Sequence, residues 1–119
     1  MNMNETISKA IGIHSKWTFH LEQAIRLGTS DYKPEIVKSD SHCEFGKWLV
    51  TEAPATLRIL PIYRDIKDLH AQFHIEAGRV LALALSGKKE QAAQEIGLGS
   101  RFKELSSTLV LKLASLKTK

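Results

Sequence analysis

A helical spacing of apolar residues runs through most of the chain and constrains its fold more than any other feature. Near the N-terminus, residues three or four positions apart form one stripe: Ile7, Ile11, His14, Thr18, Leu21 and Ile25. This period places them on one face of a helix, and Gly28 can cap its C-terminal end. No useful length of sequence alternates apolar and polar residues as a strand would. The sequence therefore predicts an all-α fold whose first helix spans about residues 5–27.

A loop and a short helix are expected next. Residues 29–39 contain Pro34 and several polar side chains, which favour a loop. Asp40 or Ser41 can cap a short second helix over residues 41–50.

Two further long helices complete the pattern. The third is expected from Pro61 to Ser86, because proline suits a first helical turn and Gly87 suits a helix end. The fourth is expected from Lys88 to Leu116. Gly97 and Gly99 lie in its middle, where each weakens a helix by roughly 1 kcal/mol relative to alanine, and they mark a kink or a close helix contact.

Three long amphipathic helices and one short one predict a four-helix bundle, formed as a single domain over residues 1–119. The hydrophobic fraction of 43% is enough for one core. A net charge of +4 gives no indication of nucleic-acid binding. No apolar run approaches the roughly 18–20 residues of a membrane helix. The lone cysteine and the absence of a signal peptide indicate a reduced, cytoplasmic protein.

A pair of histidines one helical turn apart gives the first sign of a metal site. His70 and His74 share one face of the third predicted helix, where two imidazoles can bind one ion. The alternative is a pair of polar residues at the surface. Ala71 follows His70 where a zinc metalloprotease has glutamate, so that enzyme class is not supported.

His14 and Cys43 extend the pair to four candidate ligands. His14 occupies a core position in the first stripe, where it is either a hydrogen-bonded core histidine or a ligand. Cys43 is either a small buried apolar residue or a ligand. Three histidines and one cysteine would complete a tetrahedral zinc site. Magnesium and calcium prefer oxygen, whereas ligand type alone does not separate zinc from copper or iron.

The remaining residues of interest are expected to lie outside this site. His20 and His42 should be at the surface, while Trp17 and Trp48 should serve packing. Metal-bound histidines donate their other ring N–H to a carbonyl or a carboxylate, and three acidic residues are possible acceptors here: Glu22, Asp68 and Glu76.

With His14 before Trp17, Cys43 in the motif CEFGKW, and His70 with His74 in HAQFH, the chain resembles the chemoreceptor zinc-binding (CZB) family from about residue 7 to 116. The resemblance implies a four-helix bundle that binds zinc through His14, Cys43, His70 and His74. It also implies a regulator that responds to zinc or to oxidants such as hypochlorous acid. Such domains are attached to chemoreceptors or diguanylate cyclases, and they often dimerise.

These features together predict a sensory zinc-binding domain that is not an enzyme and that controls a chemotaxis or cyclic-di-GMP output. Cys43 is the expected redox-sensitive ligand. The alternatives are a small zinc hydrolase, in which water replaces Cys43, and a metal-free helical interaction module. No receptor coiled coil or cyclase motif is present, so the chain is either a fragment or a standalone domain, and the start at Met1 favours a complete short protein.

A symmetric homodimer is also expected. The bundle has more apolar helix positions than one seam needs, among them Leu83, Leu85, Val110 and Leu111.

Overall fold

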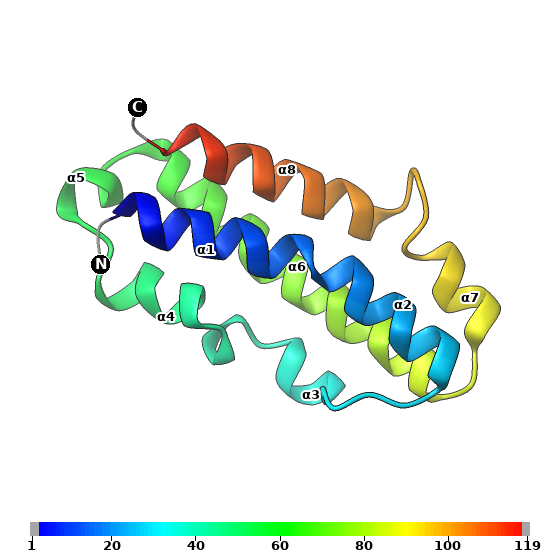
Figure 1. The fold of residues 1–119 in the computed structure, drawn as a ribbon. Coiled ribbons are helices and arrows are strands. Elements are labelled where there is room, and N and C mark those ends of the chain that lie inside the picture. Colours follow the sequence, from blue (N-terminus) through cyan, green and yellow to red (C-terminus); the bar gives the residue numbers. More distant parts are fainter. Residues whose placement is uncertain (1–2, 118–119) are drawn as a thin grey trace.

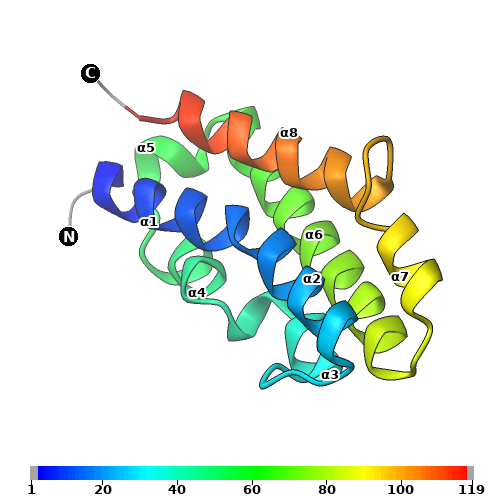
Figure 2. The same cartoon turned by 45° about the vertical axis from the view of Figure 1, so that its right-hand side comes forward.

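The first predicted helix is present, with one interruption. The computed structural model describes residues 3–117, and in it α1 (Met3–Ser15) and α2 (Trp17–Leu27) follow one another along one rod (Figures 1 and 2). Lys16 separates them, yet its N–H donates to the carbonyl of Gly12 at 3.2 Å and the helical direction continues. Gly28 ends α2 as predicted, in the left-handed conformation at φ 74°.

After α2, the structure differs from the prediction in both the expected loop and the expected short helix. The expected loop contains one helical turn, α3 (Pro34–Val37), which begins at its proline. The short helix begins later than expected, as α4 (Glu44–Thr51), and neither Asp40 nor Ser41 caps it. Asp40–His42 instead form a 3-10 turn, η1, because Cys43 adopts an extended conformation (φ −93°, ψ 135°) that separates the turn from α4.

The third predicted helix is confirmed as α6 (Pro61–Leu85), which follows a single turn, α5 (Ala55–Arg58). Proline occupies the first turn of α6, as expected from its fixed φ and missing N–H. Gly87 follows α6 with φ 79°.

The prediction of one continuous fourth helix is wrong. The region forms α7 (Lys89–Gln94) and α8 (Arg101–Ser115), joined by a turn. Gly99 takes φ 82° in that turn. The hydroxyl of Ser100 then accepts the N–H of Lys103 at 3.2 Å and caps α8. A left-handed residue followed by a serine cap favours a new helix over continuation of the old one.

The helices enclose one elongated core, with overall dimensions of 45 × 25 × 20 Å. The rod α1–α2 and helix α8 both pack on α6, and α3, η1 and α4 lie along the remaining side of α6 (Figures 1 and 2). The largest fully buried apolar side chains are Phe73, Phe102, Ile7, Leu21, Ile66, Leu81, Leu109 and Leu113. Residues 3–117 contain no strand, which confirms the all-α class. Short segments, rather than one helix, occupy the fourth side of the predicted bundle.

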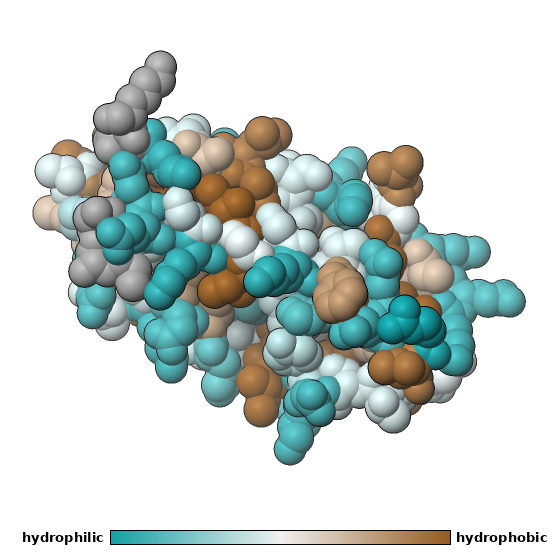
Figure 3. All heavy atoms as spheres, in the orientation of Figure 1, coloured by the Kyte–Doolittle hydropathy of each residue, from teal (hydrophilic) through white to brown (hydrophobic). Residues whose placement is uncertain are grey.

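The ends of the predicted domain, residues 1–2 and 118–119, lie outside the described part of the chain. Hydrophilic side chains cover much of the face shown in Figure 3, with apolar side chains in separate patches. Within residues 3–117, every helix is too short or too polar to cross a bilayer.

Candidate metal centre

Four side chains from three separate parts of the chain meet at one point inside the helices. His14 comes from α1, Cys43 from the junction of η1 and α4, and His70 and His74 from successive turns of α6. One donor atom from each lies within 4.8 Å of all the others. The residues that the sequence singles out as candidate ligands are therefore the ones that the fold brings together.

The separations match those that a small tetrahedral ion imposes. The Nε2 atom of His70 lies 3.0 Å from Nε2 of His14 and 3.1 Å from Nε2 of His74. The Sγ atom of Cys43 lies 3.7 Å from Nε2 of His14. Tetrahedral zinc, with bonds of about 2.0–2.1 Å to nitrogen and 2.3 Å to sulfur, separates two nitrogens by about 3.3 Å and nitrogen from sulfur by about 3.6 Å.

The centre is closed on the histidine side and reaches solvent at the cysteine. His14 and His70 are fully buried and His74 is 5% exposed, whereas Cys43 is half-buried. Two phenylalanines contribute apolar walls. Phe45 of α4 meets the rings of His14 and His70 edge-on, and Phe73 of α6 meets the ring of His14.

Hydrogen bonds define which nitrogen of two rings carries the proton. Nδ1 of His14 lies 2.7 Å from the carbonyl of Ala10, and Nδ1 of His74 lies 2.8 Å from the carbonyl of Val37. A carbonyl only accepts, so each Nδ1 must carry its hydrogen and donate it. The Nε2 atoms of both neutral rings are then bare lone pairs, and both point at the same place.

Burial keeps these groups uncharged in the metal-free molecule. Desolvation lowers the pKa of His14 to about 4 and that of His70 to about 2, and it also lowers the pKa of His74. Desolvation likewise raises the pKa of the Cys43 thiol. Neutral imidazole is the form that binds metal, and a cation beside the sulfur would favour the thiolate. Converging lone pairs inside an apolar shell fit a metal ion with nitrogen and sulfur ligands.

A missing side chain lets α4 come close enough to complete the centre. A Cβ atom on Gly46 would overlap the carbonyl oxygen of Asp40 and lie 3.1 Å from Cε1 of His70. The CEFGKW motif therefore has glycine at position 46 because no larger residue fits there. Gly78 plays a similar part on α6, since a Cβ there would lie 2.8 Å from Cβ of Lys38.

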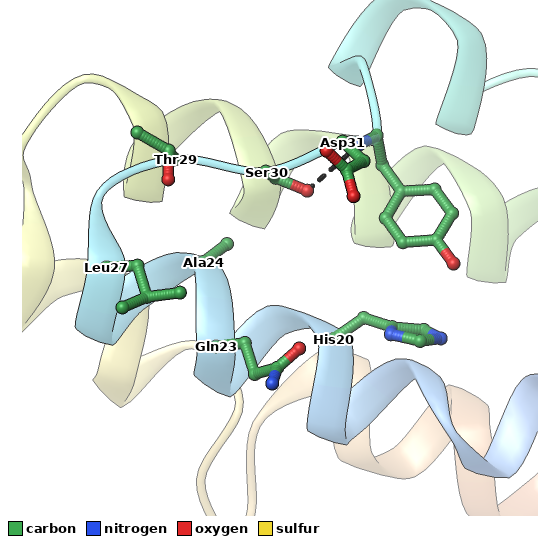
Figure 4. Close-up of a pocket in the computed structure, with 8 residues that line it drawn as sticks. His20, Gln23, Ala24, Leu27, Thr29, Ser30 and Asp31 are labelled. Atoms are coloured by element: carbon green, nitrogen blue, oxygen red, sulfur yellow. Dashed lines mark hydrogen bonds between the residues drawn. The ribbon is translucent and has the colours of Figure 1, made fainter.

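The other histidines lie away from the four candidate ligands, as predicted. His42 is exposed in η1. His20, expected at the surface, is half-buried and packs against both Trp17 and Tyr32, with ring centroids 5.2 and 4.9 Å away. Figure 4 shows His20 lining a separate pocket, in which α2 faces the loop that contains Asp31.

The two tryptophans serve packing, as expected. Trp17 is buried in the core. Trp48 is partly buried and stacks on Phe45, with ring centroids 5.8 Å apart.

For His14 and His74, the ring N–H groups meet carbonyls, one of the two predicted kinds of acceptor, and none of the three acidic candidates. Glu22 and Asp68 are exposed, and Glu76 pairs with Arg79 at 2.9 Å. The acceptors are the backbone carbonyls of Ala10, one turn before His14, and of Val37, the last residue of α3. The carbonyl four residues before a helical histidine could have been anticipated, whereas nothing in the sequence points to Val37.

Comparison with known proteins agrees with this arrangement. The chemoreceptor zinc-binding domain family matches residues 14–81, a span that includes all four candidate ligands. Diguanylate cyclase DgcZ of Escherichia coli (strain K12) is 31% identical in an alignment of 81 residues that covers 66% of this chain. The matched part is 27% of that relative's length. No solved structure matches the chain significantly. The chain therefore belongs to the chemoreceptor zinc-binding domain family.

Proposed function

We propose that residues 1–119 form a single regulatory domain that binds one zinc ion through His14, Cys43, His70 and His74. The observation that carries this proposal is the convergence of three Nε2 atoms and one Sγ atom within 4.8 Å. In His14 and His74, Nδ1 donates its hydrogen to a backbone carbonyl, which leaves Nε2 with a lone pair for the metal. Such a donor set suits zinc.

The number of ligands supports a regulatory rather than a catalytic site. Zinc enzymes keep one position open for water, whereas four protein ligands close the coordination shell. We propose that the domain controls a chemotaxis or cyclic-di-GMP output, in line with its family and with the diguanylate cyclase that it resembles. A reduced thiolate ligand also favours a cytoplasmic location.

Cys43 is the ligand through which an oxidant could act. It is half-buried and lies before the short helix α4, whereas the histidines are closed off on longer helices. Bound zinc favours its thiolate, which reacts with hypochlorous acid to give sulfenic acid and chloride. The sulfenic acid is a weaker donor, so three histidines would hold the ion less tightly.

Metal analysis of protein purified without a histidine tag tests the site. We expect about one zinc per chain, and weaker zinc binding by Cys43→Ser in competition with a chelator. His42→Ala is the matched control, because it alters the exposed neighbour of Cys43 and should bind like the parent. A parent protein without zinc affinity would favour a metal-free interaction module. Equal binding by Cys43→Ser and the parent would remove Cys43 from the site.

Equimolar hypochlorous acid tests the oxidant branch of the proposal. Treated parent protein should bind zinc more weakly, and a thiol reductant should restore the affinity if oxidation stops at sulfenic acid. An unchanged affinity would leave zinc itself as the signal.

We further propose that the domain forms a homodimer. Leu111 on α8 is 71% exposed, whereas Leu83 and Leu85 pack against the core and do not contribute the outward surface expected of them. Light scattering at tens of micromolar should give the mass of a dimer, and Leu111→Lys should shift it towards a monomer. Leu98→Lys is the control, since Leu98 is a 94% exposed residue of the turn before α8. A monomeric parent would contradict the proposal.

A further inference from the structure

His70 differs from the other two histidines of the centre. The Nδ1 atoms of His14 and His74 each donate to a backbone carbonyl, but Nδ1 of His70 is buried and has no hydrogen-bond partner within residues 3–117. Buried polar atoms are almost always paired, because an unpaired one loses its interaction with water and gains nothing in return. This atom therefore needs an explanation.

The surrounding lone pairs indicate where the proton of His70 lies in the metal-free molecule. Its Nε2 atom faces the unprotonated Nε2 atoms of His14 and His74 at 3.0 and 3.1 Å. Three bare lone pairs at these distances repel one another, so His70 is favoured as the tautomer that carries hydrogen on Nε2 and donates it to its neighbours. Its Nδ1 atom is then a lone pair.

The carboxylate of Asp40 lies just beyond hydrogen-bonding distance of that atom. Oδ2 of Asp40 is 3.9 Å from Nδ1 of His70, and the side chain is 44% exposed. A carboxylate and a nitrogen lone pair do not attract one another, which accounts for the gap. The backbone of Asp40 is held in place, because its carbonyl accepts the N–H of Cys43 at 3.3 Å and lies against Gly46.

We propose that Asp40 is the positioning residue of His70 and engages it only in the tautomer that metal binding requires. A metal at Nε2 needs the lone pair there, so the hydrogen of His70 must move to Nδ1. That N–H then faces Asp40, whose carboxylate accepts it. The net release is one proton, from the thiol of Cys43, because the His70 proton only changes nitrogen through exchange with solvent. This inference rests on the proposed zinc site.

Charge supports the same pairing. Zinc contributes +2, the thiolate −1 and Asp40 −1, so the loaded centre with its aspartate is neutral. A net positive charge among buried rings is stabilised by an opposite charge close by. Asp40 would thus balance the single positive charge that remains when zinc is bound by three neutral histidines and one thiolate.

The affinity of variants for zinc gives the first test. Loss of a carboxylate behind a metal-bound histidine typically weakens metal binding 10–100-fold, and we expect a reduction of about that size for Asp40→Ala. Asp40→Asn keeps an acceptor oxygen without the charge and should fall between. Asp68→Ala is the matched control, since it removes an exposed carboxylate from α6 two residues before His70. It should bind zinc like the parent.

Nitrogen NMR of the His70 ring gives a readout that general weakening of the fold would not produce. In the parent, zinc should move the hydrogen from Nε2 to Nδ1, and the new Nδ1–H should exchange slowly with solvent. In Asp40→Ala that exchange should be fast at full zinc loading. Circular dichroism of the metal-free variants checks that they fold, and if Asp40→Ala does not fold, Asp40→Asn and the parent spectra decide.

The outcomes separate this inference from the zinc site itself. A parent that binds no zinc overturns the proposed function and, with it, the inference. A parent that binds zinc while Asp40→Ala matches both the parent and Asp68→Ala overturns the role of Asp40 alone. A protected Nδ1–H in Asp40→Ala also overturns it, because water or another group would then be the acceptor.

Discussion

At Gly46, the space for one methyl group decides whether α4 can reach the histidines. A Cβ atom there would overlap the carbonyl of Asp40 and press on the ring of His70. Gly46→Ala should therefore displace α4 and weaken zinc binding at least tenfold, measured by chelator competition. Gly12→Ala is the control, because nothing lies within 4 Å of a Cβ there. It should stabilise α1 by about 0.4–1 kcal/mol. Equal zinc affinities for the two variants would contradict this steric explanation.

We expect the buried histidines to make the stability of the metal-free protein sensitive to acid. The pKa of His14 falls to about 4 and that of His70 to about 2 in the fold, against 6.5 ordinarily, because burial disfavours the charged rings. Below pH 6.5 the unfolded chain therefore binds protons that the folded chain does not. Stability is fully present above that pH and falls as the pH approaches 4, by about 2 kcal/mol per histidine at pH 5.

Urea unfolding of chelator-treated protein checks this expectation. The midpoint should be lower at pH 5 than at pH 7. His42→Gln, which removes an exposed histidine, should show the same drop as the parent. A midpoint that stays constant over this range would mean that the histidines are not closed off from solvent.

At the scale of elements, we expect α4 to be the part that depends most on the metal. It has eight residues, and isolated helices shorter than about 12–15 residues are marginal in water. We expect zinc removal to loosen α4 and to shift the fluorescence of Trp48 to longer wavelength, as its stack on Phe45 opens.

The chain has two tryptophans, so this measurement needs one variant for each. Trp17→Phe isolates the signal of Trp48. Trp48→Phe leaves Trp17, which is buried in α2 and should hardly respond. Zinc release with an unchanged Trp48 spectrum would show that α4 stays in place.

Helix ends with a strong local signal could be predicted from the sequence, whereas a break inside an apolar stripe and a contact between distant residues could not. The predicted ends of α6 are confirmed, because Pro61 and Gly87 each set the local backbone conformation. The predicted fourth helix is divided because Gly99 adopts a left-handed conformation, which the spacing of apolar residues in that helix does not reveal. The four candidate ligands were found by spacing and motif. The contact between Asp40 and His70 joins residues thirty positions apart, and no local pattern encodes it.

At the scale of the whole molecule, one ion would connect three parts of the chain. Binding to the folded state alone stabilises it by about 2.7 kcal/mol when free zinc is 100 times Kd. For a chain of 119 residues this corresponds to a rise in Tm on the order of 10 °C. Thermal unfolding with and without zinc measures it. His74→Ala should lose most of the rise and His20→Ala should keep it. A rise that persists in His74→Ala would point to zinc binding elsewhere.

The unequal burial of the candidate ligands also has a consequence for the rate at which zinc would be released. A chelator in solution cannot reach the buried imidazoles, so we expect a bound ion to leave only when the half-buried Cys43 and α4 move aside. The opening of α4 is a motion within the protein, so its rate does not depend on the concentration of chelator. Release should therefore reach a plateau as chelator increases, instead of rising in proportion. Such a domain would stay loaded with zinc after the zinc supply falls, for as long as α4 stays closed.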